Sequence, residues 1–164
     1  MVDNSRSQQK HGNCRLERDD NNIVWLHLDL AGRSVNLLNQ AVIRELDEII
    51  KTLHDNPPQA LIIVSDKTDS FIFGADIREF TRLDTQQQAE EFLHNGHKLM
   101  NRLEALPCPT VSMIHGFCLG GGTELSLACN YIVASDHTKT KIGLPEIKLG
   151  IFPGYGGTAR SIDR

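Results

Sequence analysis

Four short apolar stretches along the chain have the pattern of β-strands. In residues 23–30, polar and aromatic positions alternate with aliphatic ones, which is the period of a strand with one face toward a core. The segment Ala60–Ser65 is almost continuously apolar, as in a strand that is buried on both faces of a parallel sheet. Thr110–Ile114 and Tyr131–Ala134 are further runs of strand length. The pattern predicts a strand at each of these places.

Two longer segments repeat their apolar residues at helical spacing. In the first, Asn36 is the expected N-cap, and the Asn-Pro-Pro run at residues 56–58 ends the helix. The second spans residues 85–106, and Pro107 and Pro109 stop it. The apolar positions are Leu38, Val42, Leu46, Ile49, Ile50 and Leu53 in the first helix and Phe92, Leu99, Leu103 and Leu106 in the second.

The stretches between these elements complete an alternating order. We expect residues 71–77 to be a strand end that runs into a loop, residues 116–122 to be a turn, and residues 124–129 to be a short helix. The resulting order β-α-β-α-β-α-β predicts an α/β fold. The polar residues 1–13 are predicted to be a flexible N-terminal tail, which leaves residues 14–164 as one domain.

The last residues of the chain have the pattern of a loop followed by the start of a helix. Residues 150–158 are loop-like, and residues 159–164 resemble the first turn of a helix. Few domains end at such a point, so we expect the chain to be a fragment of a longer protein.

Composition and charge narrow the classes of function. With 40 % hydrophobic residues and 23 % charged residues, the chain resembles a soluble globular protein. The net charge of −4, without a basic stripe, argues against nucleic acid as the main partner. The first residues lack the apolar core of a secretory signal. The apolar run at residues 111–133 is interrupted by glycines, Glu124 and Asn130, so it predicts a buried strand and helix rather than a membrane span.

The cysteines and histidines do not predict a disulfide framework or a metal site. The four cysteines form no CxxC pair, which indicates reduced intracellular thiols. His94 and His97 could share one face of a helix, but no third ligand is evident near them. The cysteines are Cys14, Cys108, Cys118 and Cys129.

The most informative segment for chemistry is CLGGGTE, at residues 118–124. Its three consecutive glycines precede a helical pattern and leave the backbone open to the close approach of another group. The first N–H groups of a helix have no partner inside the helix, and the helix dipole favours negative charge in front of them. Glu124 follows at once, so an oxyanion pocket and a proton-transfer group are predicted within a few residues of each other.

Two further segments join this one in a family resemblance. FGAD at residues 73–76, GGGTE at residues 120–124 and GLPE at residues 143–146 occur in the order and spacing that resemble the enoyl-CoA hydratase (crotonase) family. The likeness is greatest to the amino-terminal hydratase/isomerase region of the multifunctional fatty-acid oxidation alpha subunits, and it covers residues 14–164. It implies a crotonase-type superhelix of repeated ββα units, here without the C-terminal helices of the family.

The resemblance also implies roles for individual residues. The backbone N–H groups of Ala75 and Gly121 would form the oxyanion hole, and Glu124 and Glu146 would be the catalytic carboxylates. Two carboxylates that share one water should titrate as an interacting pair in which at least one pKa is raised. We assign Glu124 as the base that activates water and Glu146 as the acid that protonates carbon, although the sequence does not fix this division. Residues expected to contact the substrate or coenzyme A are Gly74, Asp76, Ile77, Gly120, Pro145, Pro153 and Gly154.

Several of these residues also have simpler interpretations. Glu124 could merely complement the helix dipole, and Glu146 could be an exposed loop residue. Asp76 is more readily explained as the cap of a helix that starts after it. Cys118 has no partner histidine, so we interpret it as a packing residue, and we expect His115 to order the turn that follows it. For Glu124 and Glu146, it is the joint pattern that favours the catalytic interpretation.

The predicted activity is hydration of trans-2-enoyl-CoA to 3-hydroxyacyl-CoA in fatty-acid β-oxidation. Isomerisation of the double bond is a further activity of the same pocket, with Glu146 as the better candidate for it. The open alternatives are another thioester reaction on this scaffold, such as hydrolysis or decarboxylation, and an acyl-CoA-binding fragment without turnover. Arg33 and Lys67 are candidates to bind the phosphates of coenzyme A.

The expected surroundings follow from the same resemblance. No metal or redox cofactor is expected, because coenzyme A arrives as part of the substrate. Residues 154–157 do not complete a dinucleotide fingerprint, so NAD is not assigned. We expect a cytoplasmic oligomer, with a thiolase subunit as partner if the parent protein is multifunctional, and neither nucleic acid nor a membrane span.

Overall fold

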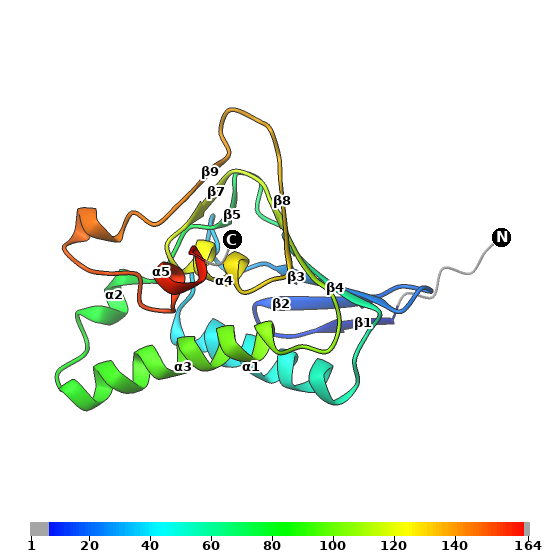
Figure 1. The fold of residues 1–164 in the computed structure, drawn as a ribbon, viewed down its shortest axis with the longest axis horizontal. Helices are drawn as coiled ribbons and strands as arrows, with labels where there is room; N and C mark the ends of the chain where they lie inside the picture. The colour runs from blue at the N-terminus through cyan, green and yellow to red at the C-terminus, as the bar shows by residue number, and fades with distance from the viewer. Residues whose placement is uncertain (1–6, 163–164) are drawn as a thin grey trace.

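The computed structural model describes residues 7–162, which form two β-sheets and a set of helices (Figure 1). The larger sheet has six strands in the order β1-β2-β3-β4-β6-β8, and the smaller has three in the order β5-β7-β9. The strands of the larger sheet are β1 (Ser7–Lys10), β2 (Cys14–Arg18), β3 (Ile23–Leu28), β4 (Ala60–Ser65), β6 (Thr110–Ile114) and β8 (Tyr131–Ala134); those of the smaller are β5 (Ser70–Ile72), β7 (Phe117–Leu119) and β9 (Lys141–Gly143).

The chain winds through the two sheets in a repeating path. β4, β6 and β8 are parallel neighbours in the larger sheet, and each is followed by one strand of the smaller sheet, where β5, β7 and β9 are again parallel. A helix follows each second strand. This is the expected superhelix of ββα units. The helices are α1 (Gln40–Asp55), α2 (Ile77–Phe80), α3 (Gln86–Glu104), α4 (Gly121–Leu127), α5 (Gly157–Arg160) and the 3₁₀ helix η1 (Glu146–Leu149).

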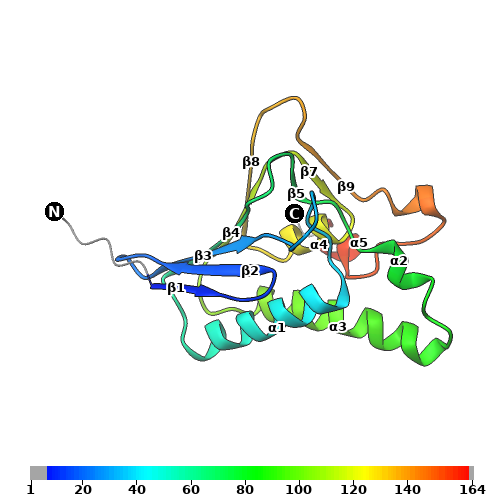
Figure 2. The ribbon, with the colours of Figure 1, turned by 180° about the vertical axis from the view of Figure 1, so that it is seen from behind.

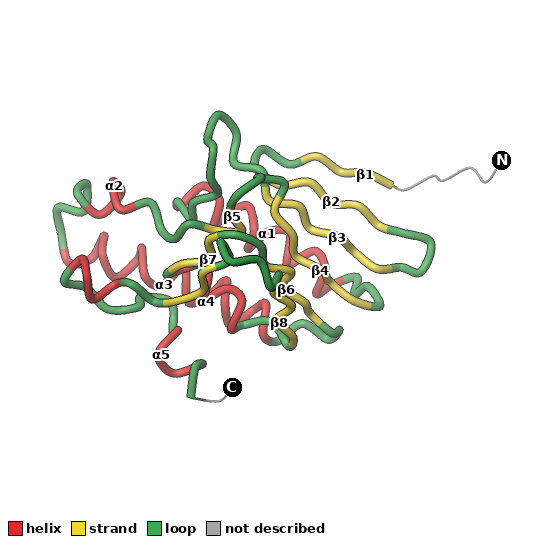
Figure 3. Tube along the Cα trace, turned by 90° about the horizontal axis from the view of Figure 1, so that it is seen from above, coloured by secondary structure: helices red, strands yellow, loops and turns green. Residues whose placement is uncertain are grey.

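The two long helices form one layer of the fold. Figures 1 and 2 show α1 and α3 side by side along one face of the larger sheet, and Figure 3 shows the six strands lying across them. Most of the apolar stripe predicted for each helix is buried at this interface, because a helix in such a layer must cover its apolar face; Phe92 of α3 instead lines the cavity described below. The fully buried side chains of this layer include Leu26, Leu61, Ile63, Leu46, Ile50, Leu99 and Leu103.

Most of the predicted elements are confirmed, but β1, β2, β7, β9, η1 and the start of α1 differ from the prediction. Residues 7–10 form β1, paired antiparallel with β2, so the predicted flexible tail is wrong for these residues; residues 1–6 of that tail lie outside the described residues. The predicted turn at residues 116–122 contains the strand β7. The strands β2 and β9 were not anticipated, because each is short and mostly polar or glycine-containing.

A further difference concerns the start of α1. Its N-cap is Asn39 and not Asn36. The side chain of Asn39 accepts a hydrogen bond from the N–H of Val42. Asn36 lies three residues earlier, and its side chain is buried in a separate network described below. The second long helix was predicted over residues 85–106; Thr85 is its N-cap and the helix spans Gln86–Glu104. Residues 163–164, the end of the last predicted helix, lie outside the described residues.

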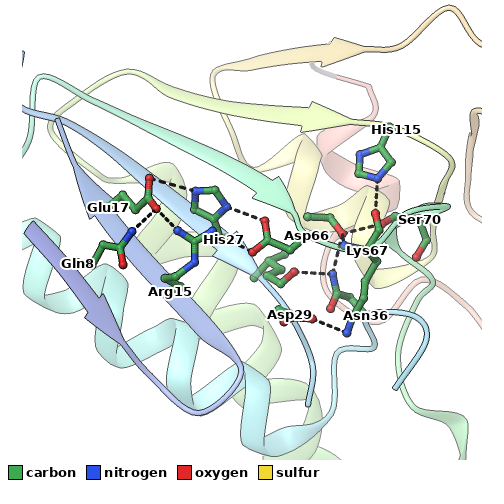
Figure 4. A network of polar contacts seen from close by, with 12 residues as sticks. Gln8, Arg15, Glu17, His27, Asp29, Asn36, Asp66, Lys67, Ser70 and His115 are labelled. Carbon is green, nitrogen blue, oxygen red and sulfur yellow. Dashed lines mark hydrogen bonds and ion pairs between the residues drawn. The ribbon is translucent and has the colours of Figure 1, made fainter. Parts of the chain in front are cut away.

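The other face of the larger sheet carries polar side chains that connect neighbouring strands (Figure 4). His27 Nδ1 lies 2.7 Å from Asp66 Oδ1, and Arg15 bonds both Asp66 and Glu17. Gln8 on β1 donates to Glu17 on β2 at 2.8 Å. These contacts link β1 through β4, but pairs of this exposure each contribute little to stability.

No helix within residues 7–162 is both long and apolar enough to cross a membrane.

Candidate active site

The main cavity of the described residues has a volume of about 530 Å³ and lies between α2, α3, the start of α4 and the segment around residues 145–155. Its wall is mostly apolar, which is typical of ligand sites with a few oriented polar groups. The only carboxylates among its lining residues are Glu124 and Glu146. The apolar wall includes Phe73, Ile77, Phe80, Leu83, Ala89, Phe92, Leu93, Leu119, Leu149, Ile151, Phe152 and Pro153.

The segment that contains Ala75 is fixed by backbone pairing with residues 36–38. The Leu38 N–H donates to the Gly74 carbonyl at 2.9 Å, and the Asp76 N–H donates to the Leu38 carbonyl at 3.2 Å. Gly74 has a φ of +118°, which residues with a side chain rarely adopt. Ala75 lies between these two bonds and lines the cavity, and within residues 7–162 its own N–H has no backbone or side-chain acceptor.

Asn36 connects this segment to the two sheets. Its side-chain oxygen accepts from the Leu30 N–H at 2.9 Å, and its amide nitrogen donates to the Leu28 carbonyl at 3.1 Å and to Ser65 Oγ at 2.9 Å. The same nitrogen lies 3.1 Å from the carbonyl of Phe71. The site therefore depends on a buried asparagine whose contacts come from β3, β4 and β5 (Figure 4).

The glycine run places the start of α4 at the cavity. Gly120 has a φ of +51°, and a Cβ there would lie 2.9 Å from Glu146 Oε1. A Cβ on Gly122 would lie 2.7 Å from the Cβ of Ile72, so the helix could not pack this closely against β5 with a larger residue. Gly121 is the first residue of α4, and its N–H has no acceptor among the described residues. The N–H groups of Gly121 and Ala75 thus belong to residues of the same cavity wall.

Glu124 is almost fully buried, and two backbone groups fix one of its oxygens. Oε1 accepts hydrogen bonds from the N–H of Tyr155 at 2.7 Å and from the N–H of Gly157 at 2.9 Å. Burial raises the pKa of Glu124, and the nearby charge of Glu146 acts in the same direction. The two N–H groups and the charge of Arg160 oppose the shift, but the net pKa lies above the ordinary value. The expectation of a raised pKa in this pair is confirmed for Glu124.

Glu146 is the first residue of η1 and is also buried. Its Oε2 atom is buried and has no hydrogen-bond partner within residues 7–162. Its Oε1 atom faces the space that a Cβ of Gly120 would occupy. A buried carboxylate oxygen without a partner is costly, so Oε2 is a group that a hydrogen-bonding ligand or a proton would stabilise.

The structure brings the predicted site residues together in the cavity wall, except Asp76 and the two candidate phosphate ligands, Arg33 and Lys67. Asp76 is not among the residues that line the cavity. Its side chain caps α2 by accepting from the Arg78 N–H, and its bonds to the Arg78 guanidinium lower its pKa. The predicted residues that do line the cavity are Gly74, Ala75, Ile77, Gly120, Gly121, Glu124, Pro145, Glu146, Pro153 and Gly154.

Three other residues from the sequence analysis lie outside the cavity wall. Cys118 and His115 have the expected structural roles, and Lys67 lies in an ion pair. Cys118 is buried, its Sγ lies 3.6 Å from Ser126 Oγ, and burial raises the pKa of the thiol, as expected of a packing residue. His115 Nε2 lies 2.6 Å from the Lys67 carbonyl, which connects the turn after β6 to the loop after β4. The Lys67 ammonium is bonded to Asp29 and to the Leu30 carbonyl, so one of the two candidate phosphate ligands already has an anionic partner.

Sequence reasoning missed the groups that orient Glu124. The Tyr155 and Gly157 donors come from a loop more than thirty positions away in the chain, as their separations from Glu124 show. It also missed the contribution of α3 to the cavity, where Ala89, Phe92 and Leu93 line the wall. Phe92 was recognised only as part of the apolar stripe, and that stripe was the available signal that α3 faces an apolar space.

Comparisons with known proteins agree with this geometry. A family model described as enoyl-CoA hydratase/isomerase matches residues 19–164. The chain is 43 % identical over 155 residues to a fatty acid oxidation complex subunit alpha of Vibrio campbellii, with 94 % of this chain and 22 % of the relative covered. A subunit alpha of Shewanella sp. is 43 % identical over 146 residues, with 88 % of this chain and 21 % of the relative covered.

Solved structures show the same fold. An enoyl-CoA hydratase from Bacillus anthracis matches with a TM-score of 0.83 and 31 % identity, over 92 % of this chain and 57 % of that one. An enoyl-CoA hydratase/carnithine racemase from Magnetospirillum magneticum matches with a TM-score of 0.85 and 28 % identity, over 99 % of this chain and 60 % of that one. The chain thus spans about a fifth of the alpha subunits and less than two thirds of these solved structures. By its family model and its relatives, the chain belongs to the enoyl-CoA hydratase/isomerase family.

Proposed function

We propose that this protein adds water to trans-2-enoyl-CoA and releases 3-hydroxyacyl-CoA in fatty-acid β-oxidation. The observation that carries the proposal is the placement of two buried carboxylates, Glu124 and Glu146, in one apolar cavity with the N–H groups of Ala75 and Gly121. The cavity would accept an acyl chain, and its few polar groups are those that the reaction needs.

The two N–H groups would bind the thioester oxygen. Addition of water to the alkene moves negative charge onto this oxygen, and donors that await the charge stabilise the enolate. Loss of one such donor typically costs about 3–4 kcal/mol of transition-state stabilisation. Ala75 suits this role because its neighbour Gly74 and its small side chain let the thioester approach, and Gly121 suits it as the first residue of α4.

The carboxylates would move the protons. In this scheme Glu124 takes a proton from water as the oxygen attacks the β-carbon, and protonated Glu146 delivers a proton to the α-carbon. Two N–H donors fix Glu124 Oε1, which leaves Oε2 of the same carboxylate to meet the water. The raised pKa of Glu124 makes it a better base than an ordinary carboxylate at neutral pH.

Isomerisation of Δ3-enoyl-CoA to Δ2-enoyl-CoA is a second proposed activity of this cavity. It needs one group that takes a proton from one carbon and returns it to another. Glu146 is favoured because its Oε2 atom is buried without a partner in the described part of the chain. Hydrolysis or decarboxylation of the thioester is less well supported, since neither needs both carboxylates.

The remaining proposals concern the rest of the substrate and the setting. Arg33, which lies close enough to Asp76 to lower its pKa, and Lys67 would bind the phosphates of coenzyme A. No resident metal or redox cofactor is proposed. The protein would act in the cytoplasm as an oligomer, and a parent with the architecture of the alpha subunits would pair with a thiolase subunit.

An assay of crotonyl-CoA hydration, measured as loss of enoyl absorbance, tests the proposal. We expect activity in the wild type and in the control Glu48→Gln, an exposed glutamate on α1, and loss of activity in Glu124→Gln and Glu146→Gln. Equal activity in all four proteins would refute the site. Acyl-CoA binding by calorimetry without turnover in the wild type would instead support a fragment that only binds.

A further inference from the structure

A glycine in the interior of α3 lies directly against the loop that orients Glu124. Gly96 is buried near the middle of this long helix, where glycine is disfavoured relative to alanine. A Cβ at Gly96 would lie 2.1 Å from both Cδ1 and Cε1 of Tyr155, a distance that two carbon atoms cannot share. The absence of a side chain at this position therefore allows the Tyr155 ring to occupy its site.

The ring fills a narrow space between two helices. It stacks on Phe92, which lies one helical turn before Gly96 on the same face of α3, with 6.4 Å between the ring centroids and 27° between the planes. On its other edge it packs close to Gly121 of α4, where a Cβ would lie 3.4 Å from the ring. Only 3 % of Tyr155 is exposed, and the residue also lines the main cavity. An added methyl group at Gly96 would push the ring off Phe92 and toward that cavity, and the displaced ring would pull on the Tyr155 backbone.

The same residue donates to the catalytic carboxylate. The backbone N–H of Tyr155 bonds Glu124 Oε1 at 2.7 Å, and the N–H of Gly157 bonds it at 2.9 Å. Movement of the Tyr155 backbone would lengthen the first of these bonds directly and the second through a chain of only two residues. The packing of the ring is therefore transmitted to the oxygen of Glu124.

A second contact attaches this loop to α3. Arg160 donates to the Tyr155 carbonyl at 2.9 Å and, from its other nitrogens, to Asn101 at 2.6 Å and to Glu104 at 3.1 Å. The loop is thus fixed to α3 at two places, by the ring at one end and by the guanidinium at the other.

We propose that Gly96 is a positioning residue for Glu124. By leaving room for the Tyr155 ring against α3, it sets the place of the two N–H groups that bond Glu124 Oε1. The role in turnover rests on the proposed function, but the geometry acts on a carboxylate whose ionisation can be measured without any substrate.

The charged groups around Glu124 fix the direction of the expected change. Glu146 raises the pKa of Glu124, Arg160 lowers it, and the phenol of Tyr155 is neutral in the range where carboxylates titrate. The two N–H groups favour the ionised carboxylate. Weaker bonds from Tyr155 and Gly157 would therefore raise the pKa of Glu124 further.

The test is a pH titration of the whole chain labelled with ¹³C at the glutamate carboxyl carbons and followed by NMR. The Glu124 signal is identified by its absence in Glu124→Gln. The variants are Gly96→Ala, Tyr155→Ala and the double variant, with His94→Ala on the exposed side of the same helix as the control. Circular dichroism melting curves show which variants fold.

We expect the pKa of Glu124 to rise in Gly96→Ala and to stay at the wild-type value in His94→Ala. In the Tyr155→Ala background, Gly96→Ala should add nothing, because the collision needs the ring. An unchanged pKa in Gly96→Ala, an equal rise in His94→Ala, or a full additional rise in the double variant would overturn the proposal. If Gly96→Ala does not fold, the double variant decides: removal of the ring should restore folding, and a double variant that melts no better than Gly96→Ala overturns the proposal.

Hydration of crotonyl-CoA by the same proteins is a separate measurement. For an active wild type, Gly96→Ala should lower kcat about tenfold with little change in KM, and the acidic limb of its pH profile should move up with the pKa of Glu124. A wild type without activity would count against the proposed function, whereas the titration would still decide the role of Gly96. A loss confined to KM would overturn the positioning role.

Discussion

The side-chain amide of Asn36 donates a hydrogen bond to the backbone carbonyl of Phe71 at 3.1 Å, although the two residues belong to different turns of the superhelix. The backbone carbonyl of the same asparagine accepts from the Phe73 N–H at 2.8 Å. Asn36 therefore contacts the segment before Ala75 with both its side chain and its main chain. One buried polar residue thus fixes the approach of a proposed oxyanion donor.

Replacement of Asn36 by alanine should strongly destabilise the protein. The Leu30 N–H and the Phe71 carbonyl would lose their bonds to Asn36, whereas the Leu28 carbonyl keeps the Asp66 N–H and Ser65 Oγ keeps its bonds to Lys67 and Ser70. Each buried group left unpaired costs about 1–3 kcal/mol. We expect Asn36→Ala to lower the free energy of unfolding by about 2–4 kcal/mol in urea. The matched control is Asn39→Ala, which removes the true cap of α1 and should cost about 1 kcal/mol. Equal costs would contradict this account.

The wrong prediction of the α1 N-cap shows what a local sequence pattern cannot determine. Asn36 and Asn39 are the same residue type, and each precedes apolar residues at helical spacing. The local pattern cannot separate them, because what distinguishes Asn36 is a set of partners on β3, β4 and β5. By contrast, β4 and α3 were predicted well because their signals lie within the elements: a continuous apolar run and a helical stripe that begins at a threonine cap.

Glu124→Gln should change how stability depends on pH. The folded pKa of Glu124 lies above its ordinary value of 4.5, so its contribution to stability is fully present below that pH and is lost as pH rises through the folded pKa. Glutamine keeps an oxygen for the Tyr155 and Gly157 donors without the buried charge. We expect the variant to be more stable than the wild type at pH 7 and equally stable near pH 4, by urea unfolding. A variant that is less stable at pH 7 would refute the burial argument.

Gly120→Ala should damage both the backbone and the site. The φ of +51° is strained for alanine by about 1–2 kcal/mol, and the new Cβ would lie 2.9 Å from Glu146 Oε1. We expect a loss of stability of about that size together with a fall in kcat. Gly143→Ala is the matched control, because a Cβ there has no heavy atom within 4 Å. Both variants are compared by urea unfolding and by crotonyl-CoA hydration, and similar effects would contradict the argument.

The reacting carboxylates of the site could be predicted from the sequence, whereas the groups that position them could not. Glu124 and Glu146 stand in the GGGTE and GLPE motifs, and the resemblance of these motifs to a known family marks both carboxylates. The donors to Glu124 are backbone N–H groups, which every non-proline residue carries, so residue identity gives no sign of them. Gly96 illustrates the same limit, since a single glycine in a helical stripe predicts only a weaker helix until the Tyr155 ring is seen against it.

The proposed division of labour between the carboxylates gives the last prediction. Hydration needs a base for water and an acid for the α-carbon, whereas isomerisation needs one group that moves a proton between two carbons. If Glu146 is that group, Glu124→Gln should lose hydration by a factor on the order of 10²–10⁴ and retain isomerisation of a Δ3-enoyl-CoA. Glu146→Gln should lose both activities, because it removes the only buried carboxylate oxygen that, among the cavity residues described, has no partner of its own.

Absorbance of the conjugated enoyl thioester follows both reactions, falling in hydration and rising in isomerisation. The opposite pattern, in which Glu146→Gln retains isomerisation and Glu124→Gln loses it, would exchange the two roles.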